Sequence, residues 1–322
     1  MEIKPVIPFE PVTVSALPTS SDWVAQIKWD GVRMLTYFDG KEVRLVNRKV
    51  NDRTMQYPEF LDISRYCRAS SVILDGEFIA FDSSRPSFHE IMKRDSLRKE
   101  QRIPLAVKQT PVTYMIFDLL YANGDWVTEK PLKERQQLLA DIIIPQPNVQ
   151  VVQNVTDAEA LYTVMKQHQM EGIVCKDLNS TYMINGKDRR WQKKKIFLDH
   201  YAAIGGFTRR NGMMNALLLG LFDAKGDFRY IGSAGIGKIG KDEWRKLEQD
   251  MAPLPDKPFV NQPDQSRDAV WTKPQFVVKV EFLEWTPAAT MRQPVIQAIV
   301  QMPVADCRFD QHPEGIMPGS IS

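Results

Sequence analysis

The sequence has few cysteines, and those it has are not arranged for cross-linking or for metal. Cys67, Cys175 and Cys307 are the only three in 322 residues, they lie far apart, and none falls in a CxxC spacing. An odd number of dispersed thiols argues against a disulfide framework and against a zinc site. We therefore expect all three to be buried or inert thiols.

Long apolar runs are also missing. The longest, residues 216–222, is interrupted by Gly220 and falls far below the ~18 residues that a membrane span needs. The first ten residues carry acids and two prolines, where a secretion signal has a basic start followed by an apolar run. We therefore expect a cytoplasmic protein with no membrane partner.

No charge of one sign dominates. The chain has 42 Lys+Arg against 40 Asp+Glu, for a net charge of +2. Bulk charge therefore does not indicate a nucleic-acid binder, and any DNA surface must come from local clusters. Basic residues gather at 44–53 and, more densely, at 187–195. For a basic run taken alone, a solvated face is the ordinary interpretation.

What the first 196 residues do contain is a mixture of strands and helices. Alternating or continuous apolar patterns predict strands at 23–28, 32–38, 42–48, 71–82, 112–121 and 172–176. The pair Asp39-Gly40 predicts a hairpin turn. Periodic apolar residues predict helices at 57–67, 87–95, 132–144 and 156–170, the last opened by a capping box of Thr156 and Glu159.

After Lys195 the strands become short and glycine-rich turns separate them. Strands are predicted at 200–208, 216–223, 228–232 and 276–285, with one helix near 242–251 and an exposed loop at 253–273. Four or five short strands with one helix favour a small barrel of the OB type. The sequence thus predicts two domains, residues 1–196 and 197–322.

Two predicted strands carry acids where apolar residues are expected. Glu77 interrupts the strand at 71–82, and Asp118 interrupts the one at 112–121. A carboxylate rarely sits inside an apolar strand unless something pairs with it. Both positions are therefore candidates for a site or for an interior ion pair.

Lys28 stands at the start of Lys-Trp-Asp-Gly-Val-Arg, between two predicted strands. This position presents the amine at a turn and does not bury it in a sheet. A nucleophilic lysine must lose its proton, and nearby cations such as Arg33 or a bound metal favour the neutral amine. Taken alone, a KxDG tetrapeptide is equally compatible with a surface lysine before an ordinary Asp-Gly turn.

The motifs that follow strengthen the case. In order come Arg48 in LVNRKVNDR, Glu77 in LDGE, Phe117 in FDLL, Glu171 in EGIVCK, and Lys193 and Lys195 after Trp191. This ordered set resembles the signature of the covalent nucleotidyltransferases, the superfamily of ATP-dependent DNA ligases, RNA ligases and mRNA capping enzymes. The resemblance implies an α+β chain: an antiparallel-sheet nucleotidyltransferase (adenylation) domain at 1–196, followed by an OB-fold β-barrel domain at 197–322.

The resemblance also implies roles for single residues. Lys28 would be the catalytic nucleophile that takes AMP from ATP. Phe117 would stack on adenine and Gln26 would meet its edge, while Glu77 would hold the ribose. The remaining assignments are Arg33 and Arg48 to ribose or phosphate oxygens, Lys193 and Lys195 to the α-phosphate, and Glu171, Glu77 and Asp30 to Mg²⁺ or Mn²⁺. Singly, each has an ordinary alternative as a core aromatic, a salt-bridge partner or a solvated charge.

Within the superfamily, GGFTRRNG and FLEWTPAATMRQP in the barrel segment are similar to the ligase domain of bacterial end-joining ligases. We therefore expect a minimal, monomeric ATP-dependent DNA ligase with no domain before Lys28. It would act on nicked or broken duplex DNA, with a Ku-like end-binding protein as a possible partner. The alternatives are an RNA ligase or GTP-using capping enzyme, and a nucleic-acid-binding relative that has lost turnover.

One family element has no clean copy. The C-terminal RxDK motif is matched best by Arg308-Phe-Asp310-Gln311, with glutamine in the lysine position, while Arg292 in MRQP matches another family arginine. The resemblance makes Arg308 the candidate for orienting pyrophosphate. If neither arginine reaches the ATP site, self-adenylylation would be slow while later steps survive.

Overall fold

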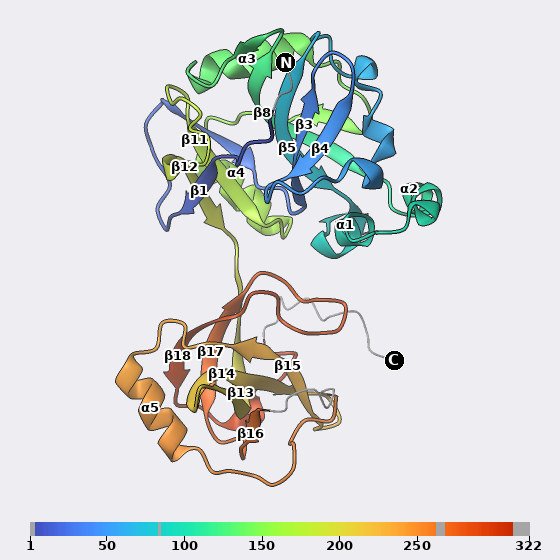
Figure 1. The fold of residues 1–322 in the computed structure, drawn as a ribbon. Coiled ribbons are helices and arrows are strands. Elements are labelled where there is room, and N and C mark those ends of the chain that lie inside the picture. Colours follow the sequence, from blue (N-terminus) through green and yellow to red (C-terminus); the bar gives the residue numbers. More distant parts are fainter. Residues whose placement is uncertain (1–3, 83–84, 262–267, 312–322) are drawn as a thin grey trace. The chain divides into compact units, whose positions relative to one another are not determined.

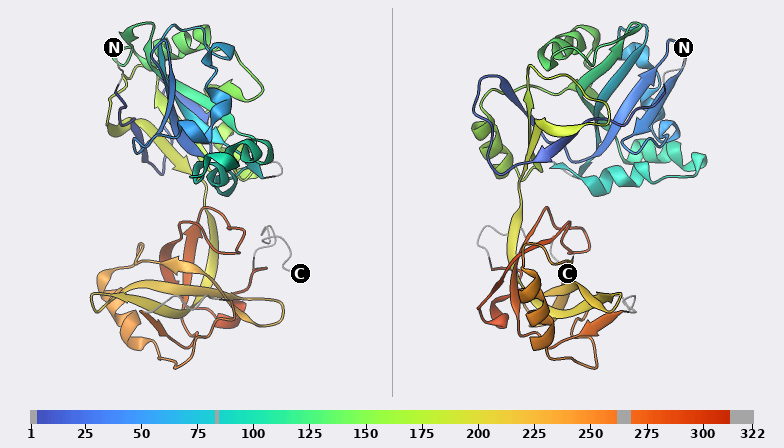
Figure 2. Two further views of the ribbon diagram at one scale, coloured as in Figure 1. Left: turned by 45° about the vertical axis from the view of Figure 1, so that its right-hand side comes forward. Right: turned by 60° about the vertical axis from the view of Figure 1, so that its left-hand side comes forward.

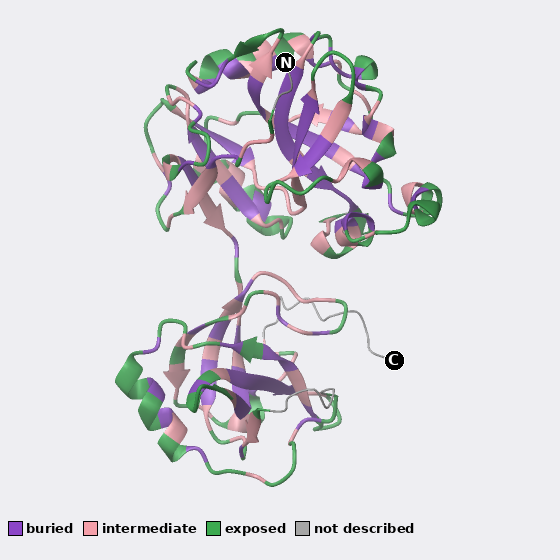
Figure 3. Ribbon diagram, viewed as in Figure 1, coloured by how far each residue is buried: buried purple, intermediate pink, exposed green. Residues whose placement is uncertain are grey.

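The structure is a computed structural model that describes residues 4–82, 85–261 and 268–311. The chain divides into two compact units, Met1–Ile196 and Phe197–Ser322 (Figure 1). Buried residues concentrate in the strands of each unit, so each has its own core (Figure 3). None of the helices formed by the described residues is long and apolar enough to cross a membrane.

Two main sheets and a small two-stranded ribbon are formed by the described residues of the first unit. The larger has the order β10-β8-β5-β3-β4, and its members are β3 (Val32–Phe38), β4 (Val43–Asn47), β5 (Val72–Ile79), β8 (Thr113–Ala122) and β10 (Val149–Val151), with β9 (Asp125–Trp126) beside β8. The smaller has the order β1-β12-β11-β2, formed by β1 (Glu10–Thr13), β2 (Trp23–Ile27), β11 (Gly172–Asp177) and β12 (Lys187–Lys195). A two-stranded ribbon joins β6 (Phe81–Asp82) to β7 (Arg85–Pro86). Except for β1 with β12 and β8 with β10, these pairs are antiparallel.

The α-helices formed by the described residues of this unit lie on the outside of these sheets (Figure 2). They are α1 (Phe88–Asp95), α2 (Ile103–Gln109), α3 (Leu132–Ile142) and α4 (Ala158–Gln167). Helix α3 packs on β8, and α4 packs on β11 and β2. Helices α1, α3 and α4 lie close to where the sequence predicts helices, at 87–95, 132–144 and 156–170.

The helix predicted at 57–67 is wrong. The chain instead forms three short 3-10 helices there: η1 (Thr54–Gln56), η2 (Pro58–Phe60) and η3 (Ile63–Arg65). Tyr57 precedes a proline, which disfavours helical backbone, and its φ and ψ are −133° and 56°. The apolar spacing that suggested a helix arises from these short turns. Tyr57 lies between η1 and η2, Phe60 ends η2 and Ile63 begins η3, and all three side chains are buried. A fourth such turn, η4 (Glu100–Arg102), precedes α2.

The start of α4 also differs from the prediction. Asp157, and not Thr156, is its N-cap, and the Asp157 carboxylate accepts a hydrogen bond from the Ala160 N–H (2.9 Å). An aspartate satisfies an orphan N–H as well as a threonine does, and its charge suits the positive end of the helix. The predicted capping box is therefore replaced by a simple aspartate cap.

The acid predicted inside the strand at 112–121 has a buried partner. Asp118 on β8 accepts two hydrogen bonds from Arg135 on α3, at 2.8 Å from Nε and 2.9 Å from Nη2, and both side chains have 0% exposure. Arg135 also donates to the carbonyls of Lys130 and Ser180. The pair thus fixes α3 to the larger sheet.

The three cysteines are buried and free, as the sequence predicts. Burial raises the pKa of Cys67, raises that of Cys175 to about 11 and raises that of Cys307 to about 12. These thiols are therefore protonated near neutral pH and unreactive.

The second unit is an antiparallel sheet of order β15-β14-β13-β17-β18, with β16 beside β13. Its elements are β13 (Leu198–Arg210), β14 (Met213–Phe222), β15 (Phe228–Ala234), β16 (Ala269–Trp271), β17 (Val277–Phe282), β18 (Val295–Val300), α5 (Lys241–Asp250) and η5 (Val304–Asp306). Backbone hydrogen bonds from Lys238 to Ile296 (2.9 Å) and from Met291 to Ile231 (2.6 Å) tie the two ends of the sheet together. The sheet therefore curls towards a barrel.

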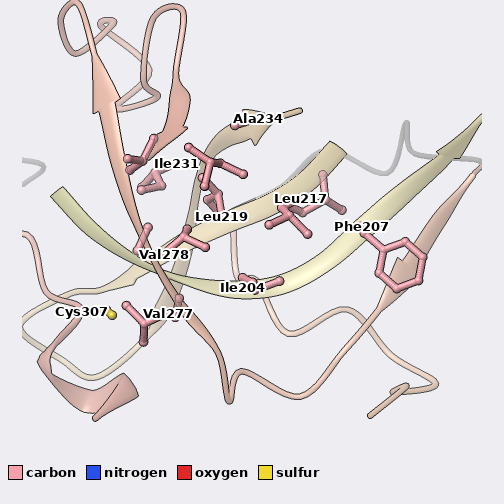
Figure 4. Packing of buried hydrophobic residues seen from close by; sticks show 14 of the residues in the cluster. Ile204, Phe207, Leu217, Leu219, Ile231, Ala234, Val277, Val278 and Cys307 are labelled. Carbon is pink, nitrogen blue, oxygen red and sulfur yellow. The ribbon is translucent and has the colours of Figure 1, made fainter. Parts of the chain in front are cut away.

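The interior of this barrel is apolar. Ile204, Leu219, Ile231 and Val278 come from four different strands and pack against one another (Figure 4). The pairing of long strand β13 with β14 shifts register at Gly205, where a Cβ would lie 2.4 Å from a ring carbon of Phe259. Strand β18 and strand β16 are additions that the sequence patterns did not predict.

Breaking the Asp118–Arg135 pair tests its contribution. Asp118→Ala leaves a buried guanidinium without its counter-charge, so the free energy of unfolding should fall by about 3–5 kcal/mol. Glu134→Ala on the same helix removes an exposed pair with Lys130 and should cost about 0.5 kcal/mol or less. Urea unfolding monitored by circular dichroism measures both. Equal losses in the two variants would contradict this account.

Candidate functional site

Lys28 directly follows β2, and its backbone N–H donates to the carbonyl of Gly172 on β11 (3.0 Å). Strand β11 lies between β2 and β12, and side chains opposite one another in a sheet share a face. The register puts Gln26 and Lys193 in one row across the three strands, and Lys28 and Lys195 in the next. The structure therefore brings these four predicted residues onto one face of the smaller sheet.

Glu171 holds two of the amines on this face. Its Oε2 lies 2.5 Å from Lys28 Nζ, and its Oε1 lies 3.4 Å from Lys195 Nζ. The three side chains are 8%, 20% and 16% exposed for Glu171, Lys28 and Lys195, so water screens the contacts only partly. One carboxylate thus fixes the positions of both lysines.

A glycine makes this arrangement possible. Gly172 follows Glu171 and has φ = +140°, which other residues rarely adopt. A Cβ there would also lie 2.2 Å from the carbonyl oxygen of Lys194. Only glycine lets β11 begin so close to β12, and this close approach brings Glu171 between Lys28 and Lys195.

Positive charge is concentrated around Lys28. Lys193 is half-buried, and its pKa is lowered by burial first and then by the charges of Lys28, Lys195 and Lys187. The cations therefore lie within electrostatic range of one another. Such a group of amines, partly removed from water, suits a polyanion such as a nucleotide phosphate chain.

Glu77 on β5 belongs to the same neighbourhood. Burial raises its pKa to about 8, the charges of Lys28 and Arg33 oppose this rise, and those of Glu171 and Asp30 add to it. The structure thus brings Asp30, Glu77 and Glu171 into one electrostatic group with Lys28. At neutral pH Glu77 is mostly protonated and can donate a hydrogen bond.

The predicted metal ligands do not form a ready-made cage. Among residues 4–82, 85–261 and 268–311, no group of three or more His, Cys, Asp or Glu side chains is placed to hold a metal ion. Both carboxylate oxygens of Glu171 already face lysines. Mg²⁺ commonly uses one or two carboxylates with substrate phosphates, so the donors present fit only a shared ion of that kind.

Arg33 is used inside the protein. Its Nε and Nη2 donate to Asp75 at 2.9 and 2.6 Å, and its Nη1 donates to the Phe9 carbonyl at 2.6 Å. Its guanidinium carbon also lies 5.3 Å from the centre of the Phe117 ring. All three nitrogens thus have protein acceptors, and the expected contact with ribose or phosphate remains a prediction.

Phe117 on β8 is half-buried beside a lysine that the sequence reasoning did not assign. The Lys176 amine donates to the Phe117 carbonyl (3.1 Å) and lies 4.4 Å from the Phe117 ring centre and 3.9 Å from the Trp191 ring. Burial lowers the pKa of Lys176 to about 7, against the opposing charges of Asp118 and Asp75. Lys176 ends the EGIVCK motif. Because every second residue of a strand lies on the same face, Lys176 shares a face of β11 with Gly172, and this spacing would have predicted its place in the site.

Arg48 and Arg308, two further predicted arginines, each have an ion-pair partner within their own unit. Arg48 is 55% exposed and lies 3.3 Å from Glu10, which is also 3.7 Å from Lys187. Arg308 belongs to the second unit and pairs with Asp310 at 3.3 Å. The alternative, Arg292, pairs with Glu284 at 2.7 Å in the same unit.

The unusual pKa of Glu77 has a measurable consequence. The unfolded carboxyl titrates near its ordinary value of 4.5 and the folded one near 8, so wild-type stability falls as pH rises between these values. Glu77→Gln cannot ionise. Relative to wild type, its free energy of unfolding should therefore increase across this window by about 1 kcal/mol or more.

Urea titrations at pH 4.5 to 8.5 measure this difference. Glu42→Gln, an exposed glutamate of the same unit, is the matched control. A difference that stays constant with pH for Glu77→Gln, or that rises equally for the control, contradicts a buried and mostly protonated Glu77.

Comparisons with known proteins fit this geometry. Residues 12–195 match the family described as ATP dependent DNA ligase domain, and residues 210–300 match ATP dependent DNA ligase C terminal region. The multifunctional non-homologous end joining DNA repair protein LigD of Mycobacterium tuberculosis is 30% identical over 292 residues, which are 87% of this chain and 36% of that protein. The SPbeta prophage-derived DNA ligase-like protein LigB of Bacillus subtilis is 28% identical over 192 residues, 59% of this chain and 67% of that one.

A solved structure described as mycobacterial DNA ligase D complexed with ATP and MES is 26% identical, with a TM-score of 0.54, covering 93% of this chain and 96% of that one. These likenesses confirm the fold predicted from the sequence, an adenylation domain followed by an OB-fold domain. The chain spans 36% of the length of the full LigD relative.

Proposed function

The chain belongs to the family of ATP-dependent DNA ligases, and we propose that it seals breaks in duplex DNA by carrying AMP on Lys28. One observation carries the proposal. The Lys28 amine is fixed by Glu171 at 2.5 Å, on a face that also presents Lys193 and Lys195. A positioned amine surrounded by cations suits attack on a phosphorus atom whose leaving group is a polyanion.

The reaction has three displacements at phosphorus. Lys28 Nζ attacks the α-phosphorus of ATP, so that an N–P bond forms, the bond to pyrophosphate breaks, and the amine gives up its proton. An oxygen of the DNA 5′-phosphate then attacks the same phosphorus, and the N–P bond breaks as the lysine nitrogen takes up a proton. Finally the 3′-hydroxyl attacks the 5′-phosphorus, loses its proton and expels AMP.

The residues around Lys28 have distinct tasks in this proposal. Phe117 stacks on adenine and Gln26 meets its edge, whereas Lys193 and Lys195 balance the charge of the phosphates. Protonated Glu77 donates to a ribose oxygen. Arg33 joins Asp75 to the Phe9 carbonyl, and its guanidinium carbon lies 5.3 Å from the centre of the Phe117 ring, so in this proposal it also supports that ring.

Mg²⁺ or Mn²⁺ would be held by the carboxylates of Asp30 and Glu171, or by that of Glu77 once it has lost its proton, together with phosphate oxygens. When bound, such an ion screens the phosphate charge and polarises the phosphorus. Glu171 becomes available to it only when Lys28 or Lys195 moves from its present partner.

Lys28 is tested by mass spectrometry. Wild-type protein incubated with ATP and magnesium should gain the mass of one AMP on Lys28, and Lys28→Ala should gain none. Nick sealing by Lys28→Ala should fall by about 10³-fold or more, because the covalent route is lost. Lys194→Ala is the matched control, since Lys194 lies on the same strand but faces Glu159 and the Tyr162 ring.

An adduct on another residue, or undiminished sealing by Lys28→Ala, would sink the proposal. Labelled GTP and a nicked RNA duplex run in parallel address the rival activities. Preference for either would favour a capping enzyme or an RNA ligase, whereas the family match favours DNA.

Part of strand β12 is proposed to bind DNA. Arg190 pairs with Asp188 at 2.9 Å, and Lys194 lies 4.3 Å from the Tyr162 ring, so both have uses within the fold. Lys187 and Arg189 are exposed at the outer end of the strand. Exposed cations of this kind contact phosphates without reading sequence.

DNA affinity should therefore depend strongly on salt. If Lys187 and Arg189 each contact a phosphate, the double change Lys187→Gln/Arg189→Gln should lower the slope of log affinity against log salt by about 2. Fluorescence anisotropy with a nicked duplex measures it. Arg245→Gln, an exposed arginine on α5, should leave the slope unchanged, and an unchanged slope in the double variant would contradict the assignment.

We further propose that the chain works as a monomer in the cytoplasm and that a Ku-like end-binding protein assists it on broken ends. Support comes from the LigD relative, a multifunctional non-homologous end joining DNA repair protein. Sealing of blunt ends with and without such a protein tests the partnership, and equal rates would refute it.

A further inference from the structure

Three carboxamides form a chain of hydrogen bonds beside Lys28. Gln26 Nε2 donates to Asn154 Oδ1 (2.8 Å), Asn154 Nδ2 donates to Gln136 Oε1 (3.3 Å), and Gln136 Nε2 donates to the Phe117 carbonyl (2.8 Å). These residues come from β2, the segment after β10, α3 and β8. We refer to them together as the amide relay.

The Phe117 carbonyl at the end of the relay determines which way each carboxamide is oriented. A carboxamide can turn over and exchange its donor for its acceptor, but a backbone carbonyl only accepts. The Phe117 carbonyl therefore requires the NH₂ of Gln136, which leaves Gln136 Oε1 for the Asn154 NH₂. Asn154 Oδ1 in turn requires the NH₂ of Gln26.

The consequence appears at Gln26. Its NH₂ is turned to Asn154, and among the residues that the structure describes its Oε1 accepts no hydrogen bond. Gln26 as a whole is 2% exposed, and its side chain shares a face with Lys28. An oriented acceptor therefore stands next to the nucleophile, where it can meet a donor on a bound base.

We propose that the amide relay makes the site select adenine over guanine. The inference rests on the proposed function, in which Gln26 meets the edge of the base. The six-position of adenine carries an amino group, which donates to Gln26 Oε1, whereas that of guanine carries a carbonyl oxygen, which does not. Asn154 and Gln136 are positioning residues, because they act through Gln26 and do not touch the nucleotide.

The relay also resists the alternative. If Gln26 turned over to offer its NH₂ to guanine, its Oε1 would face Asn154 Oδ1, and two acceptors would meet with one hydrogen bond lost. Through the relay, Phe117 contributes to recognition of both the face and the edge of the base. The Phe117 ring stacks on the face of the base. Its carbonyl, acting through Gln136 and Asn154, determines that the Gln26 amide presents its oxygen to the edge of the base.

Nucleotide preference tests the relay. Rates of Lys28 nucleotidylation are measured with ATP and with GTP, and their ratio is compared between variants. Asn154→Leu removes the anchor of Gln26, so the ATP-to-GTP ratio should fall roughly tenfold, as expected for one hydrogen bond that discriminates. Gln136→Leu frees Asn154 to turn and should shift the ratio in the same direction.

Asn154→Asp is the matched control. Its carboxylate still accepts from Gln26, so the ratio should stay within about twofold of wild type. Asn154 is exposed, and the thermal midpoint of each variant shows whether the fold is intact. A purely structural role for Asn154 would change both rates together and leave the ratio alone.

The outcomes separate cleanly. Wild-type protein that takes up neither nucleotide overturns the proposed function and the relay with it. Normal uptake with an unchanged ratio in Asn154→Leu overturns the relay alone. Equal loss of the ratio in Asn154→Asp and Asn154→Leu also overturns it, because a retained acceptor would then have no effect.

Discussion

A single carboxylate shared by two lysines is the interaction on which the site depends. Lys28, Lys193 and Lys195 lie on one face of a small sheet, where their charges repel one another. Glu171 offsets this repulsion and fixes two of the amines at 2.5 and 3.4 Å. The arrangement exists because Gly172 allows β11 and β12 to approach more closely than any side chain would permit.

Buried charged residues of the first unit stabilise the positions of the residues around this face. Arg33 joins Asp75, Arg135 joins Asp118, and Lys176 lies between the Phe117 and Trp191 rings. Removing such groups from water is costly unless each is paired, so their geometry is strongly determined. In the proposed function this rigidity holds the Phe117 platform and, through its carbonyl, the Gln26 edge in fixed positions.

Sequence patterns predicted most of the scaffold because strand alternation and helix periodicity are local. They failed where local rules compete. The spacing at 57–67 suited a helix, but Pro58 disfavours helical backbone at Tyr57, and 3-10 turns bury the same side chains. Lys176 was passed over because, in sequence, nothing distinguishes a buried lysine from an exposed one.

The order of motifs from Lys28 to Lys195 was sufficient, by itself, to indicate the family and the fold, and it predicts Lys28 as the nucleophile. Such information survives in sequence because each motif is a short run with its own local geometry. Only the tertiary structure decided which acid holds which lysine, that Arg33 is turned inwards, and which way the Gln26 amide faces. These depend on contacts between residues that are distant in sequence, from 42 positions for Arg33 with Asp75 to 128 for Gln26 with Asn154 and 143 for Lys28 with Glu171, which no local pattern encodes.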